Sequence, residues 1–235
     1  MSPGARILVV DDEPQIRRSL QVNLESKGYP VVSVENGDEA LQALAQRSPD
    51  VIVVDLLLPG MDGIELTRRI RSRSSVPIIF LSAIGDEPKK VEALEVGADD
   101  YVTKPFSMEE LTARVRSVLR RAVGAQSRQP VFACGDLSVN FDRREVRLGS
   151  EMVKLTPTEY DLLKYMIENA DKVLTHRMLL AAVWGPGYVD QAQYLRVFVG
   201  QLRRKLEKNR ARPRFILTDP GVGYRFSTDQ TGELV

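Results

Sequence analysis

A regular alternation of two kinds of segment in residues 5–122 most constrains the fold. Short apolar, β-branched runs are separated by longer segments whose apolar residues have helical spacing, such as "PQIRRSLQVNLESKG". The runs are "RILVV", "YPVVSV", "VIVV", "VPIIF" and "DYV". Such alternation is typical of βαβ units, in which helices cover both faces of a parallel sheet. We predict a doubly wound α/β domain with five parallel strands and five helices, in which the continuously apolar "VIVV" is a central strand.

Length and charge indicate a second domain. The chain has 235 residues, more than one hydrophobic core usually serves. Residues 1–122 carry 16 Lys+Arg against 19 Asp+Glu, whereas residues 130–235 carry 16 against 13. The second half is therefore the better candidate for binding a polyanion. The predicted parts are a first domain at 1–121, a small and polar linker at 122–130, a second domain at 131–228 and a tail at 229–235.

Cysteine content and hydropathy favour a cytoplasmic protein. The single cysteine, Cys134, excludes an intramolecular disulfide framework. No apolar run approaches the roughly 20 residues that a membrane-spanning helix needs, and we see no charged, apolar, cleavable leader. We expect a cytoplasmic chain that does not enter a membrane.

Charged and polar residues directly follow the predicted strands. They are Asp11 and Asp12 after "ILVV", Asp55 after "VIVV", Ser82 after "PIIFL" and Lys104 after "DYVT". The carboxyl ends of parallel strands share one edge of the sheet, where ligands bind, so these side chains converge. Crowded carboxylates repel each other, and a hard divalent cation such as Mg²⁺ removes that cost. The pattern predicts a magnesium site.

The remaining donors at this edge suit an anion beside the metal. Lys104 and Ser82 can both donate to a phosphoryl group carried on a carboxylate. Asp55 stands at the end of a rigid strand and is followed by the loop "LLLPGMDG". We therefore expect Asp55 to be the nucleophile that accepts the group.

The motifs "LVVDDEP", "VDLLLPGMDG", "FLSA" and "GADDYVTKPF" resemble the receiver domain of bacterial two-component response regulators, over residues 5 to 122. The resemblance implies that Asp55 accepts a phosphoryl group from the phosphohistidine of a sensor histidine kinase. It also implies that Asp12, Asp55 and the carbonyl of Leu57 hold Mg²⁺, with Asp11 acting through water. Lys104 would contact the acyl phosphate, and the bond before Pro105 would be cis.

The same resemblance implies a switch and a dimer face. Phosphorylation would turn Ser82 inward, and Tyr101 would rotate into the space behind it. Members of one subfamily dimerise on activation through a self-complementary charged face. Its pairs would be Lys90 with Glu110, Asp100 with Arg114, and Asp99 with Arg121.

The second half combines short strands with three helical patterns. The strand-like pieces are "VFACG", "LSVNF", "EVRLG" and "EMVKLT", and the helical ones are "TPTEYDLLKYMIENA", "HRMLLAAVW" and "QAQYLRVFVGQLRRKLEKN". Thr156, Pro157 and Glu159 have the spacing of a capping box with proline at the first helical position. The closing "RFILTDPGVGYRF" predicts two strands around a Pro-Gly turn.

The third helical pattern is strongly basic. Residues 191–214 contain eight basic residues and one acidic residue, Glu207. The face opposite the apolar stripe carries Gln193, Arg196, Gly200, Gln201, Arg203 and Arg204. A helix of this kind beside a hairpin fits the major groove of DNA, with basic residues on phosphates and a few side chains on base edges. RNA or an acidic protein would also suit the charge.

The motifs "LTPTEYDLL", "VLTHRMLLAAVWG", "LRRKLE" and "GVGYRF" resemble the winged-helix DNA-binding domain of the OmpR/PhoB subfamily, over residues 131–228. The resemblance implies a recognition helix, a wing in which Thr218 and Tyr224 lie at contact positions, and a loop at 185–190 that can contact RNA polymerase. Pro220 stands where many relatives carry a wing-tip arginine. Within the subfamily the chain is most similar to regulators of potassium-uptake operons.

Three alternatives stay open. A regulator of a phosphate, osmotic or envelope-stress operon would carry the same motifs. A receiver that dimerises without phosphate is opposed by the intact acidic residues and Lys104. An enzyme, a phosphatase with an aspartate nucleophile, would typically place a second Asp two residues after the first, where this chain has Leu57. We therefore expect a phosphoacceptor rather than an enzyme, with at most slow loss of its own phosphate.

Overall fold

The computed structural model describes residues 4–83, 87–123 and 131–229. The chain divides into two compact units, Met1–Val123 and Gly124–Val235. Most of the predicted linker, residues 124–130, and most of the predicted tail, residues 230–235, lie outside the described residues.

The first unit is the predicted doubly wound α/β fold. Its five strands are all parallel and have the order β2-β1-β3-β4-β5, so β3 is central as its unbroken apolar run predicts. The strands are β1 (Ile7–Val10), β2 (Val31–Val34), β3 (Val51–Asp55), β4 (Ile78–Ala83) and β5 (Asp100–Lys104). The helices are α1 (Pro14–Ser26), α2 (Gly37–Gln46), α3 (Gly63–Arg71), α4 (Glu87–Glu95) and α5 (Met108–Val123).

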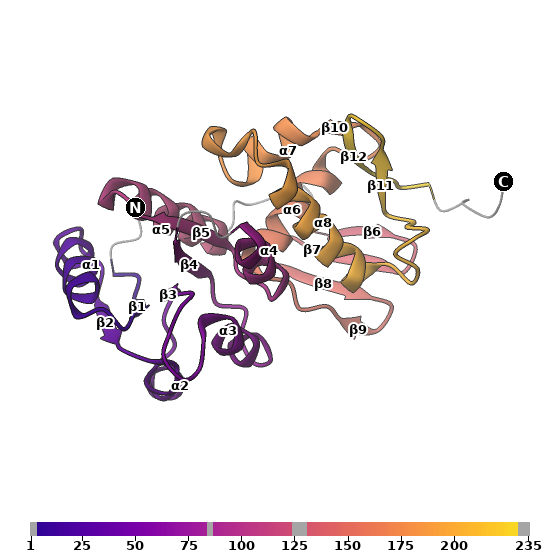
Figure 1. The fold of residues 1–235 in the computed structure, drawn as a ribbon. Helices are drawn as coiled ribbons and strands as arrows, with labels where there is room; N and C mark the ends of the chain where they lie inside the picture. Colours follow the sequence, from indigo (N-terminus) through magenta and orange to yellow (C-terminus); the bar gives the residue numbers. More distant parts are fainter. Residues whose placement is uncertain (1–3, 84–86, 124–130, 230–235) are drawn as a thin grey trace. The chain divides into compact units, whose positions relative to one another are not determined.

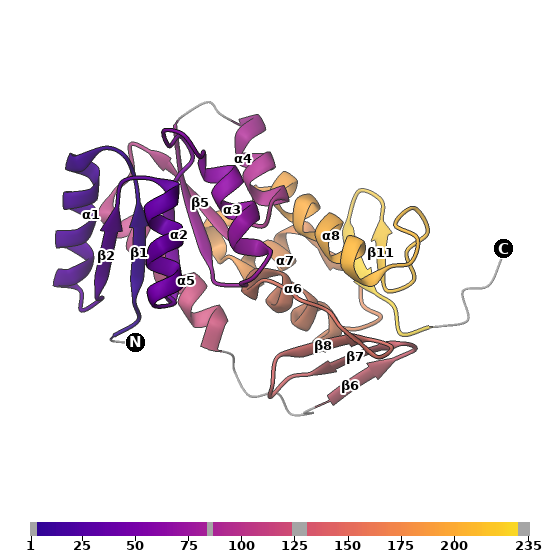
Figure 2. The same cartoon turned by 90° about the horizontal axis from the view of Figure 1, so that it is seen from below.

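Helices cover both faces of this sheet (Figures 1 and 2). On one face, Leu20 and Leu24 of α1 and Leu111 and Val115 of α5 form a continuous core with the strands. Both faces of β3 are buried, which explains why "VIVV" does not alternate. The carboxyl ends of β1, β3, β4 and β5 therefore share one rigid edge.

Within residues 131–229, the second unit contains two antiparallel sheets and three α-helices. One sheet has the order β6-β7-β8-β9 and the other has the order β10-β12-β11. The strands are β6 (Val131–Cys134), β7 (Leu137–Asn140), β8 (Glu145–Leu148), β9 (Glu151–Met152), β10 (Leu174–Thr175), β11 (Ile216–Asp219) and β12 (Gly223–Phe226). The helices are α6 (Pro157–Glu168), α7 (His176–Val183), the 3-10 turn η1 (Pro186–Tyr188) and α8 (Ala192–Leu206).

The sequence prediction missed β10, a strand of two residues. Leu174 and Thr175 pair with Tyr224 and Gly223 and add a third strand to the closing hairpin. The pairing needs glycine, because a Cβ atom at Gly223 would lie 2.0 Å from the carbonyl oxygen of Leu174. So short a strand has no periodicity from which to predict it. Of the predicted strand "EMVKLT", in contrast, only the first two residues form a strand, β9.

The predicted capping box at the start of α6 is present. The Thr156 side chain accepts a hydrogen bond from the Glu159 amide, and the Glu159 carboxylate accepts one from the Thr156 amide at 2.7 Å. Pro157 occupies the first turn, where its missing N–H costs nothing. Both Thr156 and Glu159 are buried.

We predict that Thr156→Ala lowers the free energy of unfolding of the second unit by about 1–2 kcal/mol, because the Glu159 amide loses its acceptor. The only tryptophan, Trp184, lies in this unit, so urea denaturation followed by its fluorescence measures the change. Ser150→Ala, at an exposed turn residue, is the matched control. Equal midpoints for the two variants would contradict the assigned role of the cap.

Candidate functional site

Three carboxylates meet at the carboxyl edge of the first sheet. Asp11 and Asp12 directly follow β1 and Asp55 ends β3, and their ligand oxygens lie within 4.8 Å of one another. Asp11 and Asp55 are buried, whereas Asp12 is exposed. The strand-end prediction thus placed these residues correctly. A set of carboxylate oxygens with one side open to water fits Mg²⁺, which prefers a few carboxylates and retained waters.

Lys104, the last residue of β5, holds the carboxylates together. Its Nζ donates to Asp55 Oδ2 at 2.5 Å, to Asp11 Oδ2 at 3.1 Å and to Glu13 Oε1 at 3.2 Å. Burial disfavours its charge, but the hydrogen bonds and attraction from Asp55 and Asp11 outweigh burial and raise the pKa of Lys104. The ammonium group is therefore a permanent positive charge at neutral pH.

Asp11 shows the opposite balance. Burial raises the pKa of its carboxyl, and the hydrogen bonds from the Glu13 amide and Lys104 offset that rise only in part. A dication beside this buried carboxylate would offset the cost of burying its charge.

The loop after β3 fixes the Asp55 side chain. Asp55 Oδ1 accepts a hydrogen bond from the Leu57 amide at 2.9 Å. Gly63, the first residue of α3, packs so closely that a Cβ atom there would lie 2.4 Å from the Asp55 carbonyl oxygen. The sequence "DLLLPGMDG" therefore needs its last glycine to let α3 start directly beside the strand.

The two residues of the predicted switch lie on neighbouring strands, Ser82 on β4 and Tyr101 on β5. The Ser82 hydroxyl at the end of β4 is buried and has no hydrogen-bond partner among the described residues. A buried hydroxyl without a partner costs free energy, so it suits a ligand oxygen that is present only part of the time. Tyr101 is half-buried in β5, and the ammonium group of Lys90 lies 5.0 Å from its ring centroid. The bond between Lys104 and Pro105 is cis, as the resemblance implies.

Three of the charged residues predicted for a dimer face, Asp100, Glu110 and Arg114, contact each other within the chain. Arg114 donates to Asp100 Oδ1 at 3.1 Å and to Glu110 Oε1 at 2.6 Å. Asp99 is fully buried, and its Oδ2 accepts a hydrogen bond from Arg71 at 2.9 Å. Lys90 and Glu110 come from α4 and α5, the two helices that flank β5 in the chain. The side chain of Arg121 lies outside the described residues.

Helix α8 of the second unit has one exposed polar face. It is formed by Gln193, Arg196, Gly200 and Arg204, spaced three or four residues apart. A Cβ atom at Gly200 would meet nothing within 4 Å, so the middle of this face is open. Arg196 donates to Gln193 at 3.3 Å, and basic residues fill the last turn of the helix.

The prediction that Gln201 belongs to this exposed face is wrong, because only 4% of its surface is exposed. Gln201 lies one turn beyond Val197, which is buried as well, so both lie on the buried edge of the helix. Arg203 is half-buried and donates to the Ile216 carbonyl and the Thr218 hydroxyl. Tyr224 is buried with the Arg203 guanidinium 5.7 Å from its ring centroid, whereas Thr218 is exposed.

The predicted polymerase loop at 185–190 contains η1. Gly185 has φ of +103°, which lets the chain leave α7 sharply. Tyr188 packs against Tyr194 of α8, with 5.8 Å between ring centroids, so the loop is anchored to the helix. Its residues Pro186, Gly187 and Asp190 are exposed.

Comparison with known proteins assigns both units. Residues 7–116 match the response regulator receiver domain family, and residues 149–226 match the family of transcriptional regulatory protein C-terminal domains. The chain is 46% identical over 220 residues to the KDP operon transcriptional regulatory protein KdpE of Escherichia coli, covering 94% of this chain and 98% of that protein.

The chain belongs to the response regulators of the OmpR/PhoB type.

Further relatives of this response regulator cover the same length. KdpE of Mycobacterium tuberculosis is 45% identical over 221 residues, covering 94% of this chain and 98% of that protein. Among solved structures, a mutant of RitR has a TM-score of 0.78 at 29% identity and covers 95% of this chain and 99% of its own. DrrB of Thermotoga maritima, described as an OmpR/PhoB homolog, has a TM-score of 0.51 at 32% identity with the same coverage.

The family membership establishes the general function. The chain is a transcriptional response regulator with a receiver domain and a C-terminal DNA-binding domain, and its partners are DNA and a sensor kinase. None of the helices in the described parts of the chain has the length and apolarity needed to cross a bilayer.

Proposed function

We propose that a sensor histidine kinase phosphorylates Asp55 and that this promotes receiver dimerisation and sequence-specific DNA binding. The observation that carries the proposal is the arrangement around Asp55. One carboxylate oxygen faces the Lys104 ammonium group at 2.5 Å and the other accepts the Leu57 amide at 2.9 Å. Nucleophile, cation and the unpartnered Ser82 hydroxyl thus belong to one sheet edge.

The residues of the site have separate tasks in phosphoryl transfer. The Asp55 carboxylate attacks the phosphorus atom, and the kinase histidine leaves. The Lys104 ammonium group then stabilises the new phosphoryl oxygens, and the Ser82 hydroxyl donates to one of them. Asp12, Asp55 and the Leu57 carbonyl would hold Mg²⁺, with Asp11 acting through water, and the ion would supply positive charge against the phosphoryl oxygens. Tyr101 would follow Ser82 inward and change the surface of α4, β5 and α5.

We expect no enzymatic turnover of other phosphate esters. A phosphatase needs an acid to protonate the leaving oxygen, and the residue two positions after Asp55 is Leu57, which is exposed. Hydrolysis of the chain's own acyl phosphate would therefore be slow. We place these events in the cytoplasm, where the kinase's phosphohistidine and the chromosome are both within reach.

Dimerisation and contact with RNA polymerase complete the proposed function. The dimer face would pair Lys90 with Glu110, Asp100 with Arg114 and Asp99 with Arg121 across a two-fold axis. Supporting this, the described carboxylates and cations of the set come from α4, β5 and α5 or the residue just before β5. Sedimentation of the full chain with and without phosphodonor tests it, and a monomer in both samples would contradict it. The exposed loop at 185–190 would meet the polymerase.

The target we propose is a potassium-uptake operon. The identity of 45–46% to two KdpE proteins over nearly their whole length supports this choice. PhoP of Bacillus subtilis, an alkaline phosphatase synthesis regulator, is 39% identical over 237 residues and covers 97% of this chain and 99% of that protein. A phosphate-linked target is therefore the second candidate. Genome-wide recovery of bound DNA with and without phosphodonor decides between them, and enrichment at neither promoter would overturn both assignments.

We predict that Arg204→Ala weakens binding to every duplex and lowers the slope of log K against log salt concentration by about one, because one phosphate contact is lost. Arg204 is exposed on the open face of α8. Titrations over a series of KCl concentrations measure the slope. Arg143→Ala, an exposed arginine of the same unit in the turn after β7, is the control of equal charge change and should leave the slope as it is. Identical slopes for the two variants would exclude the phosphate contact.

A further inference from the structure

Glu207 is an acidic residue where electrostatics disfavours one. It is the single acidic residue among eight basic ones in residues 191–214, and it caps the C-terminus of α8. The C-terminal end of a helix carries partial negative charge and favours cations, as the basic residues of the last turn illustrate. Glu207 is also only 8% exposed. A buried carboxylate at this end must be stabilised by something other than the helix.

Three backbone amides stabilise it. Glu207 Oε2 accepts from the Arg214 amide at 2.7 Å, and Oε1 accepts from the amides of Phe215 and Ile216, both at 2.9 Å. These amides belong to the first residue of β11, the first strand of the wing, and to the two residues directly before it. The carboxylate therefore ties the end of the recognition helix to the beginning of the wing.

Arg203 ties the same strand from the preceding turn of the helix. Its guanidinium donates twice to the Ile216 carbonyl, at 2.9 and 2.6 Å, and once to the Thr218 hydroxyl at 2.8 Å. The amide of Ile216 is thus held by Glu207 and its carbonyl by Arg203. Both residues thus join the end of α8 to β11, and Figures 1 and 2 show these two elements side by side.

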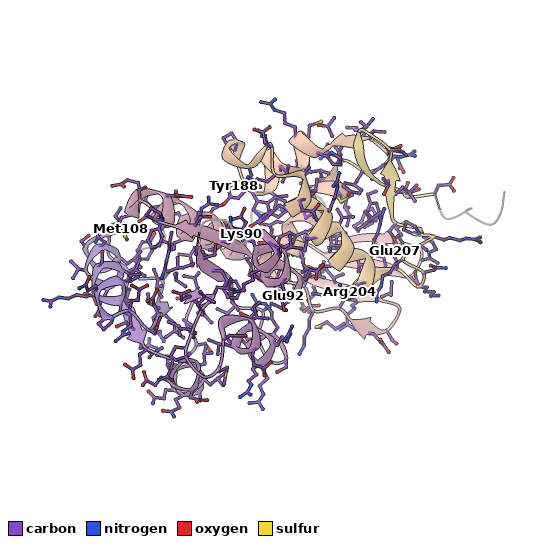
Figure 3. The ribbon with its side chains drawn as sticks, viewed as in Figure 1. Lys90, Glu92, Met108, Tyr188, Arg204 and Glu207 are labelled. Atoms are coloured by element: carbon purple, nitrogen blue, oxygen red, sulfur yellow. The ribbon has the colours of Figure 1, made fainter. Side chains whose placement is uncertain are left out.

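Lys205 contacts a different part of the second unit, the start of α6. Its Nζ donates to Glu159 Oε2 at 2.5 Å and to the Lys154 carbonyl at 3.0 Å, at the start of α6. Arg204, between these residues, is exposed. Figure 3 labels Arg204 and Glu207 near the end of α8. The basic motif "LRRKLE" therefore contains side chains that bind other parts of the same unit as well as one that is open to DNA.

We propose that Glu207 is a positioning residue for DNA recognition, which sets the wing relative to the recognition helix. The proposal rests on the proposed role of the exposed α8 face in DNA contact. With Glu207 in place, Thr218 on β11 and Arg204 on α8 keep a fixed separation and meet one duplex together. Without it, the two surfaces can still bind phosphates but do not fit one site at the same time.

Specific and non-specific binding should therefore respond differently. Non-specific binding depends on the number of neutralised phosphates, which Glu207 does not change. Specific binding depends on the simultaneous fit of helix and wing. Loss of that fit is comparable to a mismatch in the site and weakens specific binding by about tenfold.

The test uses full-length chains that carry Glu207→Gln or Glu207→Ala. Glu151→Gln, at an exposed carboxylate of the same unit, controls for the removed negative charge. One probe is a duplex that the wild-type chain selects from a randomised pool, and the other is a shuffled duplex of the same composition. Affinity for both is measured over a KCl series, and Trp184 fluorescence reports whether the unit is folded.

We expect both Glu207 variants to lose about tenfold in affinity for the selected duplex relative to the Glu151→Gln control, the Ala variant more than the Gln variant. Affinity for the shuffled duplex and the salt slope should equal those of the control. A folded Glu207→Gln chain with control affinity for the selected duplex would overturn the proposal. A slope lowered by about one would overturn it too, since Glu207 would then act on phosphate contacts.

The two Glu207 variants together also address the case in which one of them does not fold. If Glu207→Ala does not fold, Glu207→Gln decides, because Gln keeps one carbonyl oxygen for the amides of Phe215 and Ile216. If Glu207→Gln is unfolded as well, Glu207 serves the fold and the proposal is wrong. If Arg204→Ala has the same salt slope as its control, the proposed DNA-contacting face of α8 is wrong. The affinities of the Glu207 variants for the two duplexes can still be compared in that case, so the two failures are distinguishable.

Discussion

Asp55→Asn abolishes covalent labelling of the chain by acetyl phosphate and Mg²⁺. Asn keeps the shape of the side chain, but its neutral amide is a much weaker nucleophile than the carboxylate. The Lys104 ammonium group, now 2.5 Å from Asp55 Oδ2, would still have Asp11 as a partner, so the receiver should fold. Mass spectrometry of the intact chain, which gains one phosphoryl group in the wild type, measures the effect.

The control for this variant is Asp38→Asn. Asp38 is an exposed carboxylate in the first turn of α2, so it tests whether the loss is specific to the sheet edge. The control should label like the wild type. Full labelling of Asp55→Asn would move the phosphoacceptor to another residue and would remove the proposed function in its present form.

Lys104→Met lowers the free energy of unfolding of the first unit by about 2 kcal/mol at pH 7 without Mg²⁺. Asp11 and Asp55 are buried and lose their shared cation, which would cost about 3–5 kcal/mol in a fully buried pair. Partial exposure of Lys104 and the open side at Asp12 reduce that figure. Urea denaturation followed by far-ultraviolet circular dichroism measures the change.

Millimolar Mg²⁺ should restore part of the lost stability of Lys104→Met, because a dication replaces the missing charge. Trp184 fluorescence reports only on the second unit, so its transition should stay unchanged and serves as an internal control. Lys89→Met, which removes an exposed lysine of α4, should not gain dependence on Mg²⁺. A Lys104→Met chain that ignores Mg²⁺ would contradict the magnesium site.

The proposed phosphoacceptor site was predictable because topology alone brings its residues together. In a parallel sheet, the residue after each strand lies at the same edge, so Asp11, Asp55 and Lys104 could be grouped from their positions after apolar runs. The pattern could not give the direction of each interaction. That Lys104 reaches three carboxylates, and that the Ser82 hydroxyl has no hydrogen-bond partner among the described residues, depends on side-chain geometry, which periodicity does not encode.

Prediction failed where a residue's role depends on the tertiary environment of a charged or polar side chain. The polar side chain of Gln201 suggests a solvent-facing position, yet Gln201 lies one turn after Val197 on the buried side of α8. In the sequence, Glu207 is a single acidic residue among basic ones, and nothing there predicts its partners. Its three amide partners follow from the path of the chain to β11. Helical spacing gives the direction in which a side chain leaves the helix axis. It does not show which loop packs over that side chain.

The hydrogen bonds of Arg114 affect how strongly phosphorylation could favour the proposed dimer. Arg114 already pairs with Asp100 and Glu110 inside one chain. In the proposed dimer, the equivalent bond between Arg114 and Asp100 would form across the two-fold axis, so bonds are exchanged rather than added and little enthalpy is gained. Assembly would then depend strongly on how much regulator the cell contains, and synthesis of the protein would set the threshold of its response together with phosphate transfer.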